Sequence, residues 1–272
     1  MKVAVVQMVS STQVMDNVRT AQHWVAQASA DGAQLVVLPE YFGALGVRDT
    51  DKLDWAEAPG SGPVQQALAA CARSHGVWLV AGTLPIRTAM PGKVYNRCVL
   101  YGPDGQQAAS YDKVHLFRFS SPQEQYDESR VIAAGQAVVV APMTDRAGHV
   151  WQLGLSVCYD LRFPELYRQQ AAQGAHILLA PSAFTHTTGQ AHWEVLLRAR
   201  AIENQCWMLA AAQGGVHDNG RTTWGHSMVV DPWGQVLAQR SQAGAGVVYA
   251  ELDWAFLQQV RTRLPALEHR CL

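Results

Sequence analysis

The chain has 272 residues, of which 49% are hydrophobic and 16% charged, a balance typical of globular rather than disordered proteins. Its 21 basic and 22 acidic residues give a formal net charge of −1, and it has no basic run, which argues against a nucleic-acid partner. The longest apolar stretches are about eight residues, whereas a membrane-spanning helix needs about 20.

The N-terminus opens on a short apolar run, Val3-Ala4-Val5-Val6, and lacks the cleavage region of a signal peptide. The chain contains five cysteines, an odd number at spacings that form no disulfide framework. These features predict a cytoplasmic protein whose thiols are reduced.

Apolar runs of strand length recur along the chain. Most are continuous rather than alternating with polar residues, as expected for strands that are covered on both faces. The predicted strands span residues 3–8, 35–38, 78–83, 97–101, 152–157, 177–180, 206–212, 227–230 and 246–251.

Amphipathic segments between these runs predict helices. Asp16 is the expected N-cap of the first helix, Pro63 and Pro164 are expected first-turn residues of two others, and Gly32 and Gly76 are expected helix stops. The predicted helices span residues 16–30, 63–74, 164–173, 192–205 and 254–263.

Two turn sequences, Gly-Pro-Asp-Gly at 102–105 and Asp-Pro-Trp-Gly at 231–234, predict antiparallel hairpins. Together with the alternation of strands and helices, they indicate an α/β fold with mixed sheets. We find no linker, repeat or low-complexity tract, so residues 1–272 are expected to form a single domain.

Cys158 is the first candidate for chemistry. An apolar run at 151–157 ends on this thiol, and a helix-opening segment, Phe163-Pro164-Glu165, follows. The pattern predicts a sharp strand-to-helix turn, a position known for nucleophilic serines. A thiol with a pKa near 8.5 is only a few per cent ionised at neutral pH, so it needs a base or a nearby positive charge, and donors for the oxyanion.

Glu40 and Lys113 are candidate partners of this thiol. Glu40 follows a buried run and Pro39, at the carboxyl edge of the predicted sheet, where ligand clefts lie. It fits a catalytic base and equally a solvated carboxylate beyond a strand. Lys113 fits an oxyanion donor that also favours the thiolate, although a lone lysine is usually a surface charge.

Histidine is the alternative base. His115, His176, His192 and His226 lie near apolar segments, but none has a local signature of Cys-His enzymes, and structural roles are favoured for all of them. The chain has no Cys-x-x-Cys or His-Glu-x-x-His spacing, so we expect neither a metal nor a cofactor. Cys158 also fits a binding protein without activity, or a thiol redox sensor. Neither of these alternatives requires Glu40 or Lys113.

Three segments in this order carry a family resemblance: Leu38-Pro39-Glu40, Lys-Val-His-Leu-Phe at 113–117, and Val-Cys-Tyr-Asp-Leu-Arg-Phe-Pro-Glu at 157–165. Together they resemble the nitrilase superfamily of carbon–nitrogen hydrolases, over almost the whole chain. Residues 181–184, 191–203 and 225–234 are similar to the deaminated-glutathione amidases, and less closely to the ω-amidases that act on α-ketoglutaramate.

The resemblance implies a four-layer α-β-β-α sandwich, pairing into a homodimer or larger homo-oligomer, and a cysteine-dependent amidase without a cofactor. It implies that Cys158 is the nucleophile, that Glu40 is the general base and acid, and that Lys113 and the Tyr159 backbone N–H hold the oxyanion. The implied substrate is a small amide that bears a carboxylate. Deaminated glutathione, which would give α-ketoglutarate and cysteinylglycine, is the first candidate and α-ketoglutaramate the second.

The resemblance also implies further site residues. Glu128, with Glu124 as the second choice, corresponds to the glutamate that orients the lysine. Arg162 corresponds to a position that binds a substrate carboxylate in relatives, and Phe184 and Tyr41 are the other expected substrate contacts.

The chain departs from the family pattern at two places. Arg118 stands where an aspartate is usual, within an unfamiliar loop that continues through 119–127 and borders the substrate pocket in relatives. The tail after His269 is short. Residues from about 253 to 272 are expected to form a C-terminal helix and tail at a subunit interface.

Overall fold

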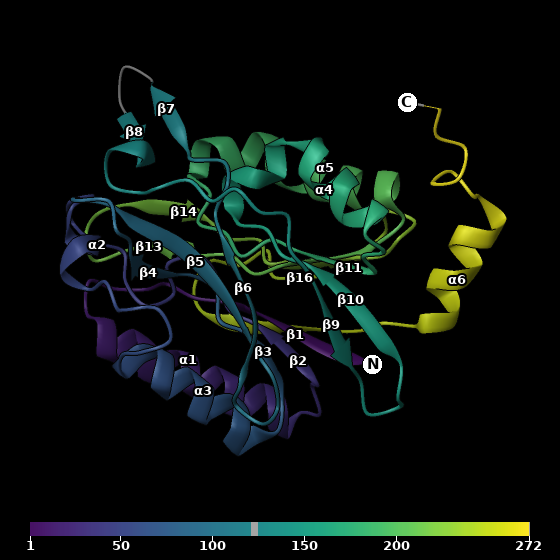
Figure 1. The fold of residues 1–272 in the computed structure, drawn as a ribbon, viewed down its shortest axis with the longest axis horizontal. Coiled ribbons are helices and arrows are strands. Elements are labelled where there is room, and N and C mark those ends of the chain that lie inside the picture. The colour runs from purple at the N-terminus through teal and green to yellow at the C-terminus, as the bar shows by residue number, and fades with distance from the viewer. Residues whose placement is uncertain (121–124, 272) are drawn as a thin grey trace.

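The computed structural model describes residues 1–120 and 125–271, which form two β-sheets packed between two layers of helices (Figure 1). Helices α1 (Val14–Ala30) and α3 (Pro63–His75) cover the outer face of the first sheet. Helices α4 (Pro164–Ala172) and α5 (His186–Asn204) cover the outer face of the second. This arrangement is the α-β-β-α sandwich expected from the sequence.

The first sheet is seven-stranded and mixed, because β1, β2 and β3 pair in parallel while the remaining pairs are antiparallel. Its order is β17 (Gly246–Glu251), β1 (Lys2–Gln7), β2 (Leu35–Val37), β3 (Trp78–Val80), β5 (Val94–Tyr101) and β4 (Leu84–Arg87), with β6 (Gln107–Asp112) also paired to β5.

The second sheet is six-stranded and also mixed, with β10, β11 and β12 in parallel. Its order is β16 (Val236–Gln239), β15 (Met228–Val230), β12 (Trp207–Ala210), β11 (Ile177–Leu179), β10 (Val150–Gly154) and β9 (Val140–Thr144). Because the parallel strands of each sheet end at one edge, the segments that follow them are brought together there.

The central parallel strands of the first sheet, β1, β2 and β3, bury both faces, as their continuous apolar runs predict. Val3 and Val5 belong to the core between the two sheets, whereas Ala4 and Val6 belong to the core beneath α1 and α3. Successive strand residues point to opposite faces, so a strand that lies between two apolar layers has mainly apolar residues on both faces.

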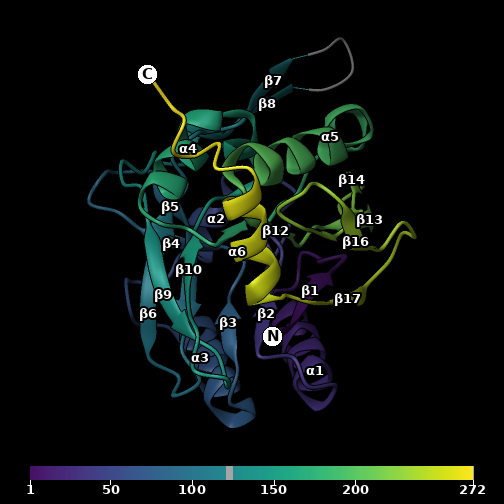
Figure 2. The ribbon, with the colours of Figure 1, turned by 90° about the vertical axis from the view of Figure 1, so that its right-hand side faces the viewer.

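The remaining elements lie around the sandwich. They are α2 (Asp51–Asp54), the pair β7 (Arg118–Ser120) and β8 (Gln125–Asp127), the 3₁₀ helices η1 (Glu128–Arg130) and η2 (Cys158–Arg162), the pair β13 (Gly214–Val216) and β14 (Thr222–Trp224), and α6 (Trp254–Arg263). Figure 2 shows α6 outside the two sheets, with the C-terminal tail running on from it. In the described part of the chain, no helix combines the length and the apolarity needed to cross a membrane.

Several predicted boundaries are confirmed. Pro63 and Pro164 open α3 and α4, and Gly76 caps α3 in the left-handed conformation, with φ of 59°. The turns at 102–105 and 231–234 join the antiparallel pairs β5–β6 and β15–β16.

Two predicted helix starts are wrong. Helix α1 begins at Val14, so Asp16 lies in its first turn rather than at the N-cap. Helix α5 begins at His186 and not at residue 192, because Thr185 caps it by accepting a hydrogen bond from the Thr188 N–H. Gly189 is a poor helix former, so the sequence does not indicate a helix here. A glycine fits at this position because a Cβ would lie 2.2 Å from the Trp224 side chain.

Candidate active site

Cys158 lies at the predicted strand-to-helix turn. The chain leaves β10, reaches Cys158 through residues 155–157, and turns into η2 and α4. The backbone of Cys158 has a φ of +51°, a left-handed conformation that non-glycine residues seldom adopt and that clusters at functional sites. Its N–H donates to the Pro181 carbonyl at 3.0 Å, which ties the turn to the segment after β11.

Hydrogen bonds to the carboxylate of Asp160 stabilise this turn. It accepts hydrogen bonds from the Val157 N–H at 2.9 Å, the Tyr111 hydroxyl at 2.8 Å and the His115 N–H at 2.9 Å. The His115 Nδ1 lies 2.7 Å from the same carboxylate. Asp160 is fully buried, so these contacts replace water and fix the backbone on both sides of Cys158.

Glu40 reaches the site from the end of β2 and is 1% exposed. Its Oε1 accepts from the Lys113 Nζ and from the Asn96 Nδ2, both at 2.9 Å, and its Oε2 accepts from the Ala183 N–H at 3.0 Å. The turn beside it requires a glycine, because a Cβ on Gly82 would lie 2.0 Å from the Pro39 carbonyl oxygen.

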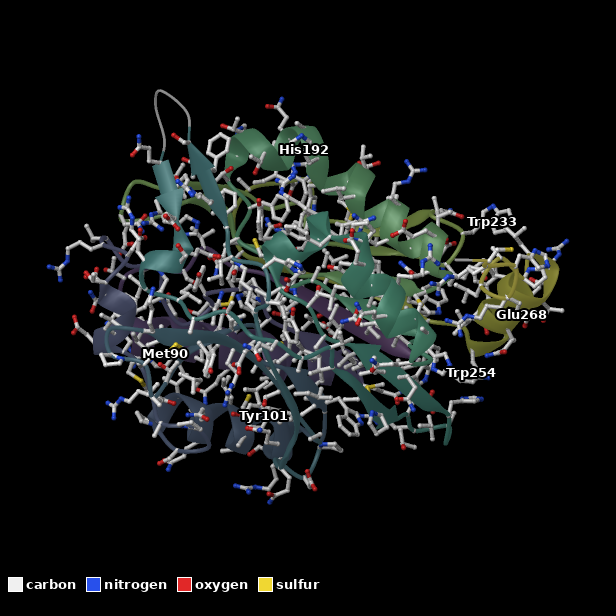
Figure 3. All side chains as sticks on the ribbon, turned by 45° about the horizontal axis from the view of Figure 1, so that its top comes forward. Met90, Tyr101, His192, Trp233, Trp254 and Glu268 are labelled. Carbon is white, nitrogen blue, oxygen red and sulfur yellow. The ribbon has the colours of Figure 1, made fainter. Side chains whose placement is uncertain are left out.

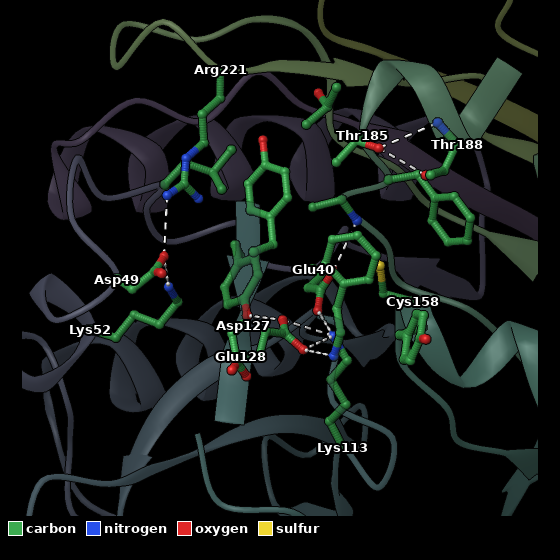
Figure 4. A pocket seen from close by; sticks show the side chains of 18 of the residues that line it. Glu40, Asp49, Lys52, Lys113, Asp127, Glu128, Cys158, Thr185, Thr188 and Arg221 are labelled. Carbon is green, nitrogen blue, oxygen red and sulfur yellow. Dashed lines mark hydrogen bonds and ion pairs between the residues drawn. The ribbon is translucent and has the colours of Figure 1, made fainter. Parts of the chain in front are cut away.

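Lys113, which follows β6, is fully buried between two carboxylates. Its Nζ lies 2.9 Å from Glu40 and 2.9 Å from Glu128. Glu128 is itself fixed by the Tyr41 hydroxyl and the Phe117 N–H, which both donate to it at 2.7 Å. Figure 4 shows this chain of contacts running from Glu128 through Lys113 to Glu40.

The electrostatics of the cluster favour a protonated thiol beside a charged lysine. Burial, and next the charge of Glu40, raise the pKa of the Cys158 thiol well above its usual value. Burial also raises the pKa of Glu40, against the opposing effect of Lys113. Burial alone would lower the pKa of Lys113, but the charges of Glu128 and Glu40 outweigh it and raise that pKa well above 10.5. The charge of Glu40 acts on the thiol, and both side chains line the same pocket, so an acceptor for the proton of the thiol lies nearby.

These side chains line one pocket. Its empty volume is about 750 Å³, including space that opens to solvent. Cys158, Glu40, Lys113 and Glu128 lie on its wall, as does Tyr159. Tyr159 is the second residue of η2, and the first N–H groups of a helix have no partner within it.

The carbon–nitrogen hydrolase family matches residues 2–262. The chain belongs to this family. The deaminated glutathione amidase of Synechocystis sp. (strain PCC 6803 / GT-S) is 43% identical over 269 residues, which cover 98% of this chain and 97% of that protein.

Solved structures of relatives have the same fold. The Caenorhabditis elegans NitFhit protein is 38% identical, with a TM-score of 0.90 over 99% of this carbon–nitrogen hydrolase; the match spans 65% of that longer chain. A variant of the amidase from Nesterenkonia sp. AN1, solved after Michael addition of acrylamide at its active-site cysteine, is 30% identical, with a TM-score of 0.78 over 97% of this chain and 98% of its own. These likenesses confirm the predicted nitrilase-type fold.

The predicted substrate contacts of this carbon–nitrogen hydrolase also line the pocket. The Arg162 guanidinium lies 5.3 Å from the ring centre of Phe184 and 5.7 Å from that of Tyr159, and an Nη1 of Arg162 lies 3.1 Å from the His192 Nδ1. Tyr41 lines the pocket as well, with its hydroxyl donated to Glu128. Arg118 opens β7, outside the residues that line the pocket, and Glu124 lies outside the described residues.

The four candidate histidines have other partners. His115 contacts Asp160 and stacks on Phe163, with ring centres 3.7 Å apart, and His176 accepts from the Gln152 N–H. Within residues 1–120 and 125–271, none of them lines the pocket. In the same ranges, no group of three or more His, Cys, Asp and Glu side chains is arranged to hold a metal ion.

The sequence did not predict Asn96, the Ala183 N–H or the aspartate anchor at 160 as parts of this site. Asn96 is 2% exposed in the middle of β5. A buried side-chain amide in a strand indicates that it has a specific partner. The partner itself, 56 residues away along the chain, has no local signature.

Proposed function

We propose that this chain is a cysteine-dependent amidase that hydrolyses deaminated glutathione to α-ketoglutarate and cysteinylglycine. The observation that supports it most is that Cys158, Glu40 and Lys113 line one pocket, in which Glu40 pairs with the buried Lys113 and raises the pKa of the Cys158 thiol. The amidase relatives named above support the reaction class and the substrate.

In the first step, Glu40 takes the proton of the Cys158 thiol as the sulfur attacks the amide carbonyl carbon. The carbonyl π-electrons move to the oxygen, and the Lys113 ammonium and the Tyr159 N–H stabilise the resulting oxyanion. One such donor typically contributes about 100- to 1000-fold in rate. The protonated resting thiol makes this proton transfer necessary.

In the second step, the oxyanion collapses and the carbon–nitrogen bond breaks. Glu40 gives its proton to the leaving amine, and a thioester remains on Cys158. Water then loses a proton to Glu40 and attacks the thioester carbonyl. Collapse of that intermediate releases the carboxylic acid, and the thiolate recovers the proton from Glu40. One carboxylate therefore serves both half-reactions, as base and as acid.

Glu128 has a supporting role in this proposal. Its carboxylate fixes the position of the Lys113 ammonium and keeps it charged, so that the lysine can stabilise an oxyanion while Glu40 changes its own charge. Arg162, at the end of the η2 helix that Cys158 opens, is the proposed partner of the α-keto acid's carboxylate.

The experiment that tests the substrate assignment is a direct kinetic comparison. Purified protein is assayed on deaminated glutathione and on α-ketoglutaramate, and kcat/KM is measured for both. We expect the higher value for deaminated glutathione. A higher value for α-ketoglutaramate makes the chain an ω-amidase, and no turnover of either amide would contradict the proposed function.

A homodimer that acts in the cytoplasm is part of this proposal. Large apolar side chains are exposed on and beside α5: Val195 is 68% exposed, Ile202 49% and Trp233 60%. Trp233 is labelled on the outer surface in Figure 3. Light scattering that reported a monomer would contradict the dimer. All five cysteines are free thiols, which fits a reducing compartment, and thiols found oxidised in intact cells would contradict that location.

A further inference from the structure

The pocket holds a second group of cations, away from Arg162. The Arg221 Nη2 lies 3.2 Å from Asp49 Oδ1, and the Lys52 Nζ lies 4.0 Å from the same oxygen. All three line the pocket, and with two cations and one carboxylate they have an excess of one positive charge. Asp127 also lines the pocket, and Arg130, whose Nε lies 3.9 Å from the Asp127 Oδ2, offsets its charge. Asp127 also accepts hydrogen bonds from the N–H and hydroxyl of Ser129 at 3.1 and 2.5 Å.

This group is built from two distant segments that the backbone holds together. Lys52 belongs to α2 and Arg221 to the turn between β13 and β14. Asn219, in that turn, donates to the Leu45 and Gly46 carbonyls at 3.0 and 2.9 Å and accepts from the Arg221 N–H at 2.9 Å. The two cations are therefore positioned before any ligand arrives, which reduces the entropic cost of binding.

Both cations are also shielded from solvent and flanked by aromatic rings. The Lys52 side chain is 13% exposed, and its Nζ lies 5.1 Å from the ring centre of Tyr41. The Arg221 side chain is 29% exposed and lies 5.8 Å from the ring centre of Tyr126. Burial lowers the pKa of Lys52, so its charge is incompletely solvated, and an anionic ligand would stabilise it.

The charges deeper in the pocket oppose an anion. Glu40 and Glu128 flank the single ammonium of Lys113, so this region has an excess of negative charge when both carboxylates are ionised. A carboxylate on the substrate is repelled there and attracted to the cations nearer the rim.

The two cationic regions lie on different sides of the pocket. Arg162 lies beside the nucleophile in η2, whereas Figure 4 shows Asp49, Lys52 and Arg221 on the other side of Glu40 from Cys158. In the proposed mechanism, Glu40 protonates the leaving amine. The leaving group must therefore extend from the sulfur toward Glu40, and beyond it toward Lys52 and Arg221.

Resting on the proposed function, we infer that Lys52 and Arg221 form a second carboxylate subsite, which binds the carboxylate of the amine-side half of the substrate. The preferred substrate is then an amide with an anionic group at each end, one for Arg162 and one for this subsite. Deaminated glutathione has both carboxylates. α-Ketoglutaramate has only the first, because its leaving group is ammonia.

The test compares deaminated glutathione with the analogue whose glycine carboxylate is replaced by a carboxamide. The two substrates share the scissile bond and the α-keto acid, so they differ only at the proposed subsite. Because a charged hydrogen-bonded pair is involved, wild-type protein is expected to prefer the carboxylate form by about 10- to 100-fold in kcat/KM. Lys52→Met and Arg221→Gln are each expected to reduce this preference toward equality.

Two matched variants make the test specific. Arg162→Gln removes a cation of the same pocket and is expected to slow both substrates while it retains the preference between them. Arg146→Gln is the second control, because it removes an exposed cation that does not line the pocket. If wild-type protein hydrolyses both substrates equally well, or if only Arg162→Gln abolishes the preference, the subsite inference is overturned and the proposed function stands. Hydrolysis of neither substrate overturns both. The wild-type comparison is informative even where a variant does not fold.

Discussion

At the scale of single residues, the proposed base, Glu40, separates this site from a Cys-His enzyme. Glu40 lines the pocket with Cys158, whereas His115 contacts Asp160 behind the turn. The segments around Glu40, Lys113 and Cys158 could be recognised in the sequence because each has a local pattern. Asn96 could not be assigned a partner, since its contact with Glu40 depends on how β2 and β5 are placed in the sheet.

Glu40→Gln is expected to lower kcat/KM by about 100- to 10,000-fold, because the amide accepts no proton from the thiol and gives none to the leaving amine. Steady-state assays across pH measure the effect. Glu251→Gln is the matched control, since this side chain is 70% exposed at the far end of β17. A Glu40→Gln protein within a few fold of wild type, with a pH profile that a histidine controls, would make the enzyme a Cys-His hydrolase.

At the scale of elements, the turn from β10 to η2 depends on contacts from β6 and the segment that follows it. Tyr111 and His115 lie 49 and 45 residues from Asp160, so no local pattern predicts that they hold the nucleophile's turn. Helix α5 illustrates the same limit. Its first turn contains Gly189, whose small size is explained only by Trp224, which packs against it in space.

Asp160→Asn is expected to reduce both activity and stability. The amide NH₂ replaces an oxygen that accepts hydrogen bonds, which leaves a buried donor facing another donor and costs about 1–3 kcal/mol. We expect kcat/KM to fall at least tenfold, measured beside chemical denaturation. Asp231→Asn is the control, because Asp231 is 4% exposed and accepts from the Trp233 and Gln235 N–H groups in a turn outside the pocket. It should keep wild-type activity; equal losses of activity in the two variants would refute the anchoring role of Asp160.

At the scale of the whole molecule, the continuous apolar strands and the turn sequences were sufficient to predict two-sided burial and mixed sheets. The short strands of the two-stranded pairs were missed, because sequences such as Arg118–Ser120 have no apolar run. The positions of α2 and of the β13–β14 turn around the pocket were also not predictable. They depend on contacts between segments far apart in the chain, such as Asn219 with Leu45.

His176 links the second sheet to α6 and makes stability depend on pH. It accepts from the Gln152 N–H and packs against Trp254, with ring centres 4.9 Å apart, and burial lowers its pKa from 6.5 to about 4. Because the folded pKa is below the unfolded one, this contribution is present above pH 6.5 and is lost as pH falls toward 4. After allowance for solvent screening, we expect a loss of about 1–2 kcal/mol over that window.

Denaturation curves between pH 7 and 4 measure this contribution. His176→Asn is expected to flatten the dependence, since an amide oxygen accepts the same hydrogen bond without titrating. His23→Asn, at an exposed position of α1, should leave the dependence unchanged. If His176→Asn retains the full pH dependence, the effect arises elsewhere.

The most direct test of the account is the rate of Cys158→Ala on deaminated glutathione, with folding verified by circular dichroism. Since every step passes through the sulfur, we predict that kcat falls by about 10,000-fold or more. Acid quench of the wild-type reaction should also yield an α-ketoglutaryl thioester on the Cys158 peptide. A folded Cys158→Ala protein that hydrolyses the substrate at the wild-type rate would contradict the account.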